Sequence, residues 1–288
     1  MFGFLNVFKP KGITSHDVVS ILRKVTKIKQ IGHTGTLDPF AQGVLPVCIG
    51  KATRLIEYLK DDKEYIAQIQ FGQNTDTYDI EGQITESFDK KITSDDLNNI
   101  LPEFRGEISQ FPPIYSAIKV NGKKLYDYAR KGEDVEIKPR KVTISKLELL
   151  DFDIENQTAK IIVGCSKGTY IRSLAFDIGK KLGCGAFLSE LTRTKAGTFY
   201  VDNAISLDNL KTKDDVKNNL INPIDVLELP IYELSELEKE KVSHGMSIQN
   251  TTNVGDLHIV ILIYSGNIYA VGEIESNKII IRKVFGEL

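Results

Sequence analysis

Hydrophobic residues recur along the chain with either helical or strand periodicity. Apolar residues three and four positions apart predict three helices, and a polar segment predicts a fourth. The first follows Thr14-Ser15, after which four apolar residues between positions 18 and 25 share one helical face. The second follows Ser94, which we expect to be its N-cap, with two aspartates at the positive end of the helix dipole. The third begins near Tyr170, and residues 202–225 predict a more polar helix with a linker.

A strict alternation of apolar and polar residues predicts strands. Every second residue from Tyr65 to Phe71 is apolar and two glutamines lie between them, which is typical of a half-buried strand over residues 64–71. Residues 160–165 predict a short β-branched strand. Beyond residue 229 we predict a small β-barrel or sandwich of roughly 60 residues. Its expected strands are 258–264, 268–274 and 278–285.

Two stretches follow neither spacing. Residues 31–39 contain two glycines and a proline, which break helices and strands, so we predict a loop there. Residues 111–141 contain Pro112-Pro113, Asn121-Gly122 and repeated lysines with tyrosines between them. We predict that this second stretch is an excursion from the core.

Length and composition indicate a globular protein. The chain has 288 residues, of which 41% are hydrophobic and 26% charged, so we expect one large domain with a small one. Its longest apolar run is far below the roughly 18–20 residues that span a bilayer. The three cysteines lie far apart and predict neither a disulfide framework nor a zinc knuckle. We therefore expect a soluble cytoplasmic protein that does not enter membranes.

Charge is distributed unevenly along the chain. The net charge of −2 taken alone argues against a nucleic-acid binder. However, Lys and Arg outnumber Asp and Glu by 8 to 2 in residues 1–54, by 9 to 4 in residues 116–146 and by 7 to 2 in residues 160–200. If these segments share one face, that face would attract a phosphate backbone. Taken alone, the charge distribution fits an ordinary solvated surface equally well.

The loop at residues 31–39 carries the densest candidate chemistry. Pro39 biases Asp38 toward an extended backbone, so this carboxylate is presented rather than buried. Taken alone, a Leu-Asp-Pro sequence is more often a turn held by the aspartate side chain. His33 alone is also weak evidence for catalysis.

The sequence supports neither a metal site nor a hydrolase. The four histidines are scattered and no two have the spacing of a helical ligand pair, so we predict no metal. Residues 164–168 match the letters of a G-x-S-x-G nucleophile elbow around Ser166. That elbow needs a later histidine, and His244 and His258 fall in the predicted small barrel, which disfavours a hydrolase.

Six short motifs follow one another over about 190 residues. They are Lys9-Pro10-Lys11-Gly12-Ile13-Thr14-Ser15, Gly32-His33-Thr34-Gly35-Thr36-Leu37-Asp38-Pro39-Phe40-Ala41-Gln42-Gly43-Val44-Leu45-Pro46, Lys63-Glu64-Tyr65, Pro113-Ile114-Tyr115-Ser116-Ala117 with Gly122-Lys123-Lys124-Leu125-Tyr126, Cys165-Ser166-Lys167-Gly168-Thr169-Tyr170-Ile171-Arg172-Ser173, and Leu191-Thr192-Arg193-Thr194-Lys195-Ala196-Gly197. This set resembles the motifs of TruB-type tRNA pseudouridine synthases. The resemblance implies an α+β fold with a bent, largely antiparallel sheet flanked by helices. It also implies a catalytic domain at residues 1–228, with an RNA-clamping insertion at about 112–142, and a short PUA-like RNA-binding β-barrel at 229–288.

The resemblance further implies the reaction, which converts uridine-55 in the T loop of tRNA to pseudouridine. The base is flipped out, the glycosidic bond breaks, and C5 of the uracil rejoins C1′ of the ribose. Asp38 matches the essential carboxylate, which either attacks C1′ or removes the 2′ proton. Arg172 matches the arginine that pairs with that carboxylate, and Tyr65 matches the tyrosine that stacks on the uracil. No cofactor or metal is implied.

Other residues match positions that bind RNA or support the loop. Tyr170 and Leu191 match pocket walls, and His33 matches the histidine that fills the space left by the flipped base. Lys9 and Pro10 match residues expected to brace the catalytic loop. The insertion also carries basic residues expected to contact phosphates, namely Lys119, Lys123, Lys124 and Arg130.

The expected partner is therefore the T arm of tRNA, bound by a monomer that needs no obligate protein partner. Two alternatives remain, a non-catalytic tRNA-binding or chaperone protein of the same fold and a synthase that works within a guide-RNA ribonucleoprotein. Asp38 disfavours the first, because a carboxylate repels phosphate. The basic insertion disfavours the second, because it matches the stand-alone bacterial pattern.

Overall fold

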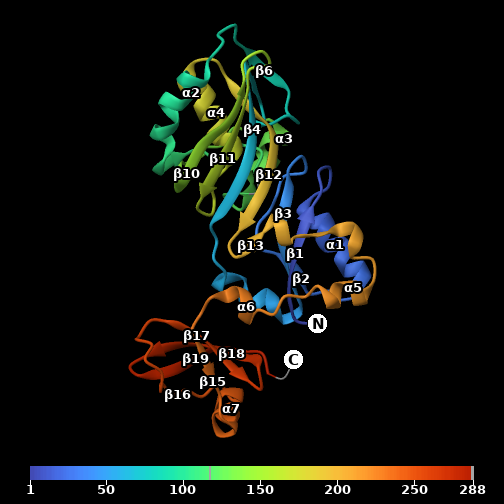
Figure 1. Ribbon diagram of the computed structural model, residues 1–288, viewed down its shortest axis with the longest axis vertical. Helices are drawn as coiled ribbons and strands as arrows, with labels where there is room; N and C mark the ends of the chain where they lie inside the picture. The colour runs from blue at the N-terminus through green and yellow to red at the C-terminus, as the bar shows by residue number, and fades with distance from the viewer. Residues whose placement is uncertain (117, 287–288) are drawn as a thin grey trace.

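A ten-stranded mixed sheet forms the centre of the protein in the computed structural model, which describes residues 1–116 and 118–286 (Figure 1). Ala117 of the fourth motif lies outside the described residues. The main path of the sheet runs β14 (Ile205–Ser206), β1 (Gly3–Lys9), β3 (Gln42–Ile49), β12 (Ala186–Ala196), β4 (Lys63–Phe71), β11 (Thr158–Cys165), β10 (Arg140–Asp153) and β7 (Gly106–Gln110). Strand β2 (Ile31–His33) pairs with β3, and β13 (Phe199–Tyr200) pairs with β12. Most pairings are antiparallel, as expected, while β1 with β14 and β3 with β12 run parallel.

The alternation predicted for residues 64–71 is present in β4. Tyr65, Ala67, Ile69 and Phe71 are buried, and the residues between them are half-buried. Because β4 lies between β12 and β11, it brings the last two motifs of the sequence to either side of Tyr65.

Two predicted helices flank the sheet. Helix α1 (Ser15–Thr26) begins at Thr14, whose hydroxyl accepts a hydrogen bond from the backbone of Asp17 while the Asp17 carboxylate accepts one from the backbone of Thr14. Helix α4 (Ile171–Leu182) packs on β12. It approaches closely at Gly179, where a Cβ would lie 2.4 Å from the backbone nitrogen of Ala186. The glycine therefore lets α4 lie against the sheet.

Two local predictions were wrong. Helix α2 (Ser94–Ile100) is capped by Thr93 rather than Ser94, because Asp96 bonds reciprocally with Thr93. The first three residues of the predicted loop at 31–39 form β2, because pairing with β3 outweighs the local effect of Gly32.

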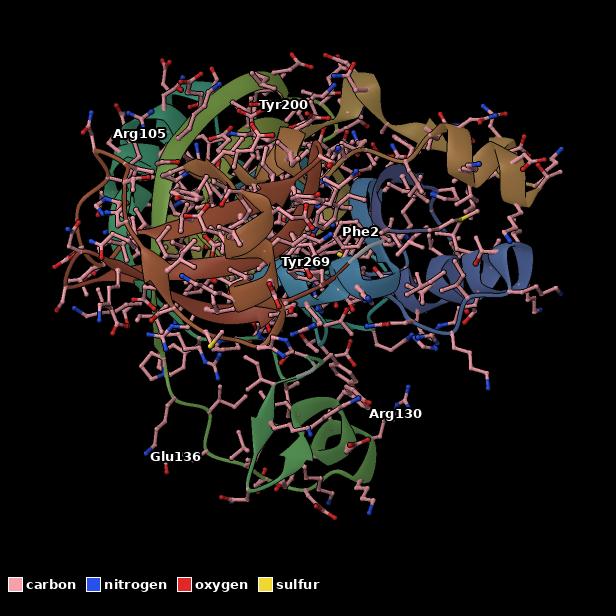
Figure 2. All side chains as sticks on the ribbon, turned by 90° about the horizontal axis from the view of Figure 1, so that it is seen from below. Phe2, Arg105, Arg130, Glu136, Tyr200 and Tyr269 are labelled. Carbon is pink, nitrogen blue, oxygen red and sulfur yellow. The ribbon has the colours of Figure 1, made fainter. Side chains whose placement is uncertain are left out.

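The predicted excursion from the core forms a lobe between β7 and β10. This insertion, residues 111–139, contains β8 (Lys119–Val120), β9 (Lys123–Lys124) and α3 (Leu125–Lys131). Figure 2 shows the lobe, with Arg130 and Glu136, standing away from the rest of the protein.

The chain after residue 229 forms a curled, open five-stranded sheet, a half-barrel. Its spatial order is β15 (Ile231–Glu233), β17 (Ile259–Tyr264), β18 (Asn267–Glu275), β19 (Lys278–Val284) and β16 (Ile248–Gln249), with α7 (Glu236–Ser243) beside it. The three longer strands, β17, β18 and β19, lie within a residue or two of the predicted segments. The half-barrel contacts the larger sheet region through Phe285, whose ring lies 5.7 Å from that of Phe2 and whose carbonyl accepts a hydrogen bond from Lys51. The boundary at 228/229 remains a prediction.

The other elements are short and connect these parts. They are the 3₁₀ helices at Gly50–Tyr58, Leu101–Phe104, Val201–Asn203 and Leu207–Asn209, the hairpin of β5 (Gln73–Thr75) with β6 (Ile84–Ser87), and the helices α5 (Lys213–Asn218) and α6 (Ile224–Leu227).

Candidate active site

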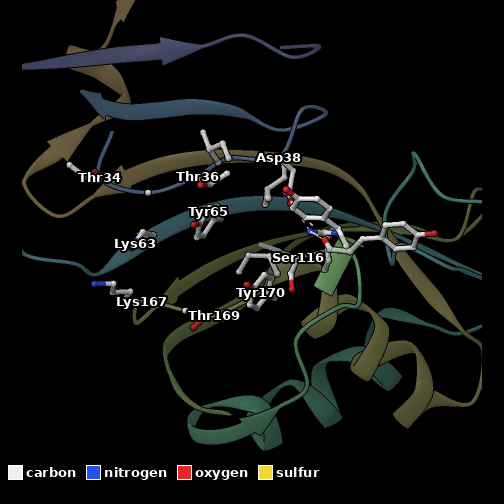
Figure 3. A pocket seen from close by; sticks show the side chains of 17 residues that line it. Thr34, Thr36, Asp38, Lys63, Tyr65, Ser116, Lys167, Thr169 and Tyr170 are labelled. Carbon is white, nitrogen blue, oxygen red and sulfur yellow. Dashed lines mark hydrogen bonds and ion pairs between the residues drawn. The ribbon is translucent and has the colours of Figure 1, made fainter. Parts of the chain in front are cut away.

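A cavity of about 410 Å³ opens where the 31–39 loop, β4, β12, the start of α4 and the root of the insertion meet (Figure 3). The structure brings together on its wall five residues that the sequence singles out. These are Asp38, Tyr65, Tyr170, Arg172 and Leu191. They come from four separate segments of the chain, so the fold alone assembles the site.

Asp38 and Arg172 form a two-point contact at this cavity. The Nε atom of Arg172 lies 3.0 Å from Oδ2 of Asp38, and Nη2 donates to Oδ1 at 3.3 Å. The Arg172 side chain is 6% exposed and that of Asp38 is 35% exposed. The buried Arg172 guanidinium therefore orients the Asp38 carboxylate, which a ligand can still reach.

Asp79 is a second partner of Arg172, and the sequence analysis missed it. Its Oδ2 lies 3.1 Å from Nη1 of Arg172, and its Oδ1 accepts a hydrogen bond of 2.6 Å from the Thr77 hydroxyl. Burial raises the pKa of Asp79, while the hydrogen bond from Thr77 and the charge of Arg172 oppose that rise. Asp79 lies in the β5–β6 hairpin, where no periodicity or quoted motif marks it.

Lys9 contacts the loop from one side, and its expected bracing role remains a prediction. Its fully buried Nζ donates to the carbonyls of Ile13 at 2.7 Å, Pro10 at 2.9 Å and Pro39 at 3.4 Å. Burial lowers the pKa of Lys9 to about 8. Pro10 itself is exposed and contributes its carbonyl.

Arg193 holds the loop from the other side, a role that the sequence analysis did not assign. Its fully buried guanidinium donates to the carbonyls of Gly35 at 3.0 Å, Thr36 at 3.4 Å and Val44 at 2.7 Å. Arg193 is also the cross-strand partner of Tyr65. The one available signal was its place in the sixth motif, two residues after Leu191.

Aromatic and aliphatic side chains form part of the cavity wall, beside charged and hydroxyl-bearing ones. Tyr65 is 6% exposed and Leu191 is 5% exposed. Burial raises the pKa of Tyr65. Tyr170 is half-buried, and burial raises its pKa as well. The rings and the leucine side chain suit a flat, neutral group such as a nucleobase.

His33 does not line this cavity in the described chain. It ends β2 opposite Val47, and the adjacent Thr34 is the first loop residue on the cavity wall. Burial lowers the pKa of His33, which favours the neutral imidazole. Its expected contact with RNA remains a prediction.

The basic residues predicted to clamp RNA lie on the insertion, outside the cavity wall. Lys123 pairs with Glu133 at 2.5 Å, and Lys124 donates to the hydroxyl of Tyr126 at 2.8 Å. The Arg130 guanidinium lies 5.4 Å from the ring centre of Tyr126, which does line the cavity. Lys119 is exposed on β8.

Residues 1–116 and 118–286 offer neither a metal-binding cluster nor a membrane-spanning helix. No group of three or more His, Cys, Asp or Glu side chains could hold a metal in this part of the chain. None of its helices is long and apolar enough to cross a membrane. Metal-free chemistry remains a prediction.

The fold defines the class of protein, which is that of the Cbf5/TruB-like pseudouridine synthases. A chain from the crystal structure of a Cbf5-Nop10-Gar1 complex matches with a TM-score of 0.74 and 27% identity, covering 100% of this protein and 88% of that chain. A chain of the archaeal box H/ACA sRNP Nop10-Cbf5 complex matches with a TM-score of 0.71 and 25% identity, covering 98% and 86%.

Sequence comparisons give the family. Residues 23–171 match the family model described as TruB family pseudouridylate synthase (N terminal domain), and residues 172–227 match the tRNA pseudouridylate synthase B C-terminal domain. The tRNA pseudouridine synthase B of Caldanaerobacter subterraneus is 46% identical over 98% of this chain and 99% of its own length. That of Francisella philomiragia is 43% identical over 99% and 95%. The chain belongs to the TruB family of pseudouridine synthases and is an isomerase that acts on tRNA.

Proposed function

We propose that this protein converts uridine-55 in the T loop of tRNA to pseudouridine, as a cytoplasmic monomer without an obligate protein partner. The observation that carries the proposal is the two-point contact between Arg172 and Asp38 on the wall of a cavity lined by Tyr65 and Leu191. A binding protein has no use for a carboxylate held toward an anionic ligand, because the two charges repel.

Asp38 acts on the sugar. Attack on C1′ and removal of the 2′ proton both need an ionised carboxylate with a fixed orientation. Arg172 supplies the orientation through two nitrogens, and Lys9 and Arg193 fix the backbone on either side of Asp38. The carboxylate therefore meets the ribose with little loss of conformational freedom.

The walls hold the uracil after the glycosidic bond breaks. The free base must rotate so that C5 faces C1′, and it must not leave during that time. Tyr65 stacks on the ring and helps to move the C5 proton, while Leu191 and Tyr170 exclude water. No cofactor takes part in this scheme.

Binding of the tRNA is assigned to surfaces around the cavity. The insertion closes on the T arm, with Lys119, Lys123, Lys124 and Arg130 near phosphates, and His33 occupies the space left by the flipped base. The half-barrel after residue 229 belongs to a PUA-like domain that binds RNA away from the target nucleotide. Shape and charge position the RNA, and the cavity selects the base.

Pseudouridine formation on an unmodified tRNA transcript tests the proposal. The purified protein is incubated with the transcript and a metal chelator, and the modified position is mapped by mass spectrometry. We expect one pseudouridine, at position 55. A well-folded protein that binds tRNA without forming product would instead support the chaperone or guided-complex alternatives.

A further inference from the structure

Helix α4, which carries Arg172, starts differently from four other helices. Helices α1, α2, α5 and α7 each begin at a Thr or Ser whose side chain bonds reciprocally with an acid three residues later. Helix α4 begins at Tyr170, whose side chain makes no capping bond and whose ring lines the cavity. In those four helices the carboxylate of that acid accepts a hydrogen bond from the backbone N–H of the first residue. In α4 the corresponding position is Ser173, which has no carboxylate, so the backbone N–H of Tyr170 needs an acceptor from elsewhere.

Gln110, the last residue of β7, supplies that acceptor. Its Oε1 accepts a hydrogen bond of 2.8 Å from the backbone nitrogen of Tyr170, and its Nε2 donates to the Tyr170 carbonyl at 3.0 Å. Gln110 is 1% exposed. Both halves of a buried amide are thus satisfied by one residue, and an apolar side chain of similar size would leave the Tyr170 N–H unpaired.

The same joint connects the insertion to Arg172. The hydroxyl of Ser173, in the first turn of α4, donates to the Phe111 carbonyl at 2.7 Å. Nη2 of Arg172 donates to the Tyr115 carbonyl at 3.1 Å. The beginning of the insertion and the beginning of α4 therefore form one hydrogen-bonded unit.

We infer that Gln110 is a positioning residue, which caps α4 from outside and thereby fixes Tyr170 and Arg172 relative to Asp38. Gln110 also links the position of Arg172 to the root of the insertion, which closes on RNA in the proposed function. The part of the test that measures pseudouridine formation rests on the proposed function.

Gln157 provides a matched control. Its Oε1 accepts from the backbone nitrogen of Ile92 at 2.8 Å, and its Nε2 donates to the Ile92 carbonyl at 3.2 Å. It is 8% exposed and precedes β11, outside the residues that line the cavity in the described chain. Gln110→Met and Gln157→Met therefore remove the same kind of contact, near the site and away from it. Ser173→Ala is a milder variant of the same joint.

The experiment measures single-turnover pseudouridine formation and tRNA affinity for wild type and the three variants. We expect Gln110→Met to slow turnover at least 10-fold and Ser173→Ala about 3-fold, with Kd within 2-fold of wild type. Gln157→Met should keep the single-turnover rate and the Kd within 2-fold of wild type, although its Tm falls about as much as that of Gln110→Met. Equal slowing by Gln110→Met and Gln157→Met would overturn the inference, as would a loss confined to affinity.

Hydrogen exchange provides a readout that does not need activity. The peptide around residues 166–174 should exchange at least 10-fold faster in Gln110→Met than in wild type, and should be unchanged in Gln157→Met. Unchanged protection in a folded Gln110→Met would overturn the inference. If the wild-type protein forms no pseudouridine, the proposed function is overturned. The role of Gln110 is then still decided by hydrogen exchange.

Discussion

Asp79 and Arg172 form an ion pair in which both side chains are nearly buried, with 3.1 Å between Oδ2 and Nη1. The other side of the guanidinium contacts Asp38, which is far more exposed. The orientation of Arg172 is thus set from behind, by a carboxylate that does not line the cavity in the described chain. Asp38 is left free to meet a substrate.

Removing the charge of Asp79 tests this arrangement. Asp79→Asn keeps the size of the side chain but weakens its hold on Arg172, so we expect at least 10-fold slower turnover. The variant leaves the nearly buried Arg172 with Asp38 as its remaining carboxylate, so we also expect the free energy of unfolding to fall, by up to about 3 kcal/mol. Turnover is therefore compared at a temperature at which both proteins are folded. Turnover equal to wild type, measured on the tRNA transcript, would contradict the arrangement.

Asp38→Asn should abolish turnover and leave tRNA affinity within about twofold. The amide can neither attack C1′ nor remove a proton, while the loop keeps its contacts to Lys9 and Arg193. Mass spectrometry of the transcript and filter binding measure the two quantities. A parallel loss of affinity would mean that Asp38 serves binding instead.

Tyr65→Phe should bind tRNA but form pseudouridine about 100-fold more slowly, a typical effect of losing a group that transfers a proton. The ring and its stacking remain, and the hydroxyl beside Arg193 is lost. Tyr232→Phe is a suitable control, since Tyr232 is also buried but lies in the half-barrel. Equal single-turnover rates for Tyr65→Phe and Tyr232→Phe would show that the Tyr65 hydroxyl takes no part in the reaction.

Lys9 should make stability depend on pH. Its pKa is about 8 in the folded protein and 10.5 without burial. Between these values the unfolded chain binds more protons, so the free energy of unfolding rises with pH, by about 3 kcal/mol at most. In urea unfolding from pH 7.5 to 10.5, the stability of wild type minus that of Lys9→Met should increase. A difference that stays constant across this range would contradict the burial of a titrating amine.

Lys119→Ala should weaken tRNA binding and reduce its salt dependence. Each phosphate contact contributes about 0.7–0.9 to the slope of log affinity against log salt concentration. Lys123→Ala should have a smaller effect, since Lys123 pairs with Glu133. Lys217→Ala, an exposed change on α5, is the control. An unchanged slope for Lys119→Ala would exclude this lysine from the phosphate contacts.

The family and the main elements could be predicted from the sequence. Alternation in β4 and the apolar spacing in α1 show directly which face of each element is buried, because the side-chain period of an element is local. The motifs likewise marked Asp38, Tyr65 and Arg172, since their neighbours in sequence are distinctive. Elements of two or three residues, such as β2 and β16, are too short to show a period.

Only the tertiary structure decided which polar groups meet. Asp79, Arg193 and Gln110 each act on a residue that is distant in the chain, and no local spacing encodes those contacts. A buried charge or amide needs a partner, but its sequence does not say which one, because the partner depends on how strands and helices are placed against each other. The sequence by itself determined the family, the longer elements and the catalytic candidates. The packing of β7, β12 and the β5–β6 hairpin around α4 decided how those candidates are held.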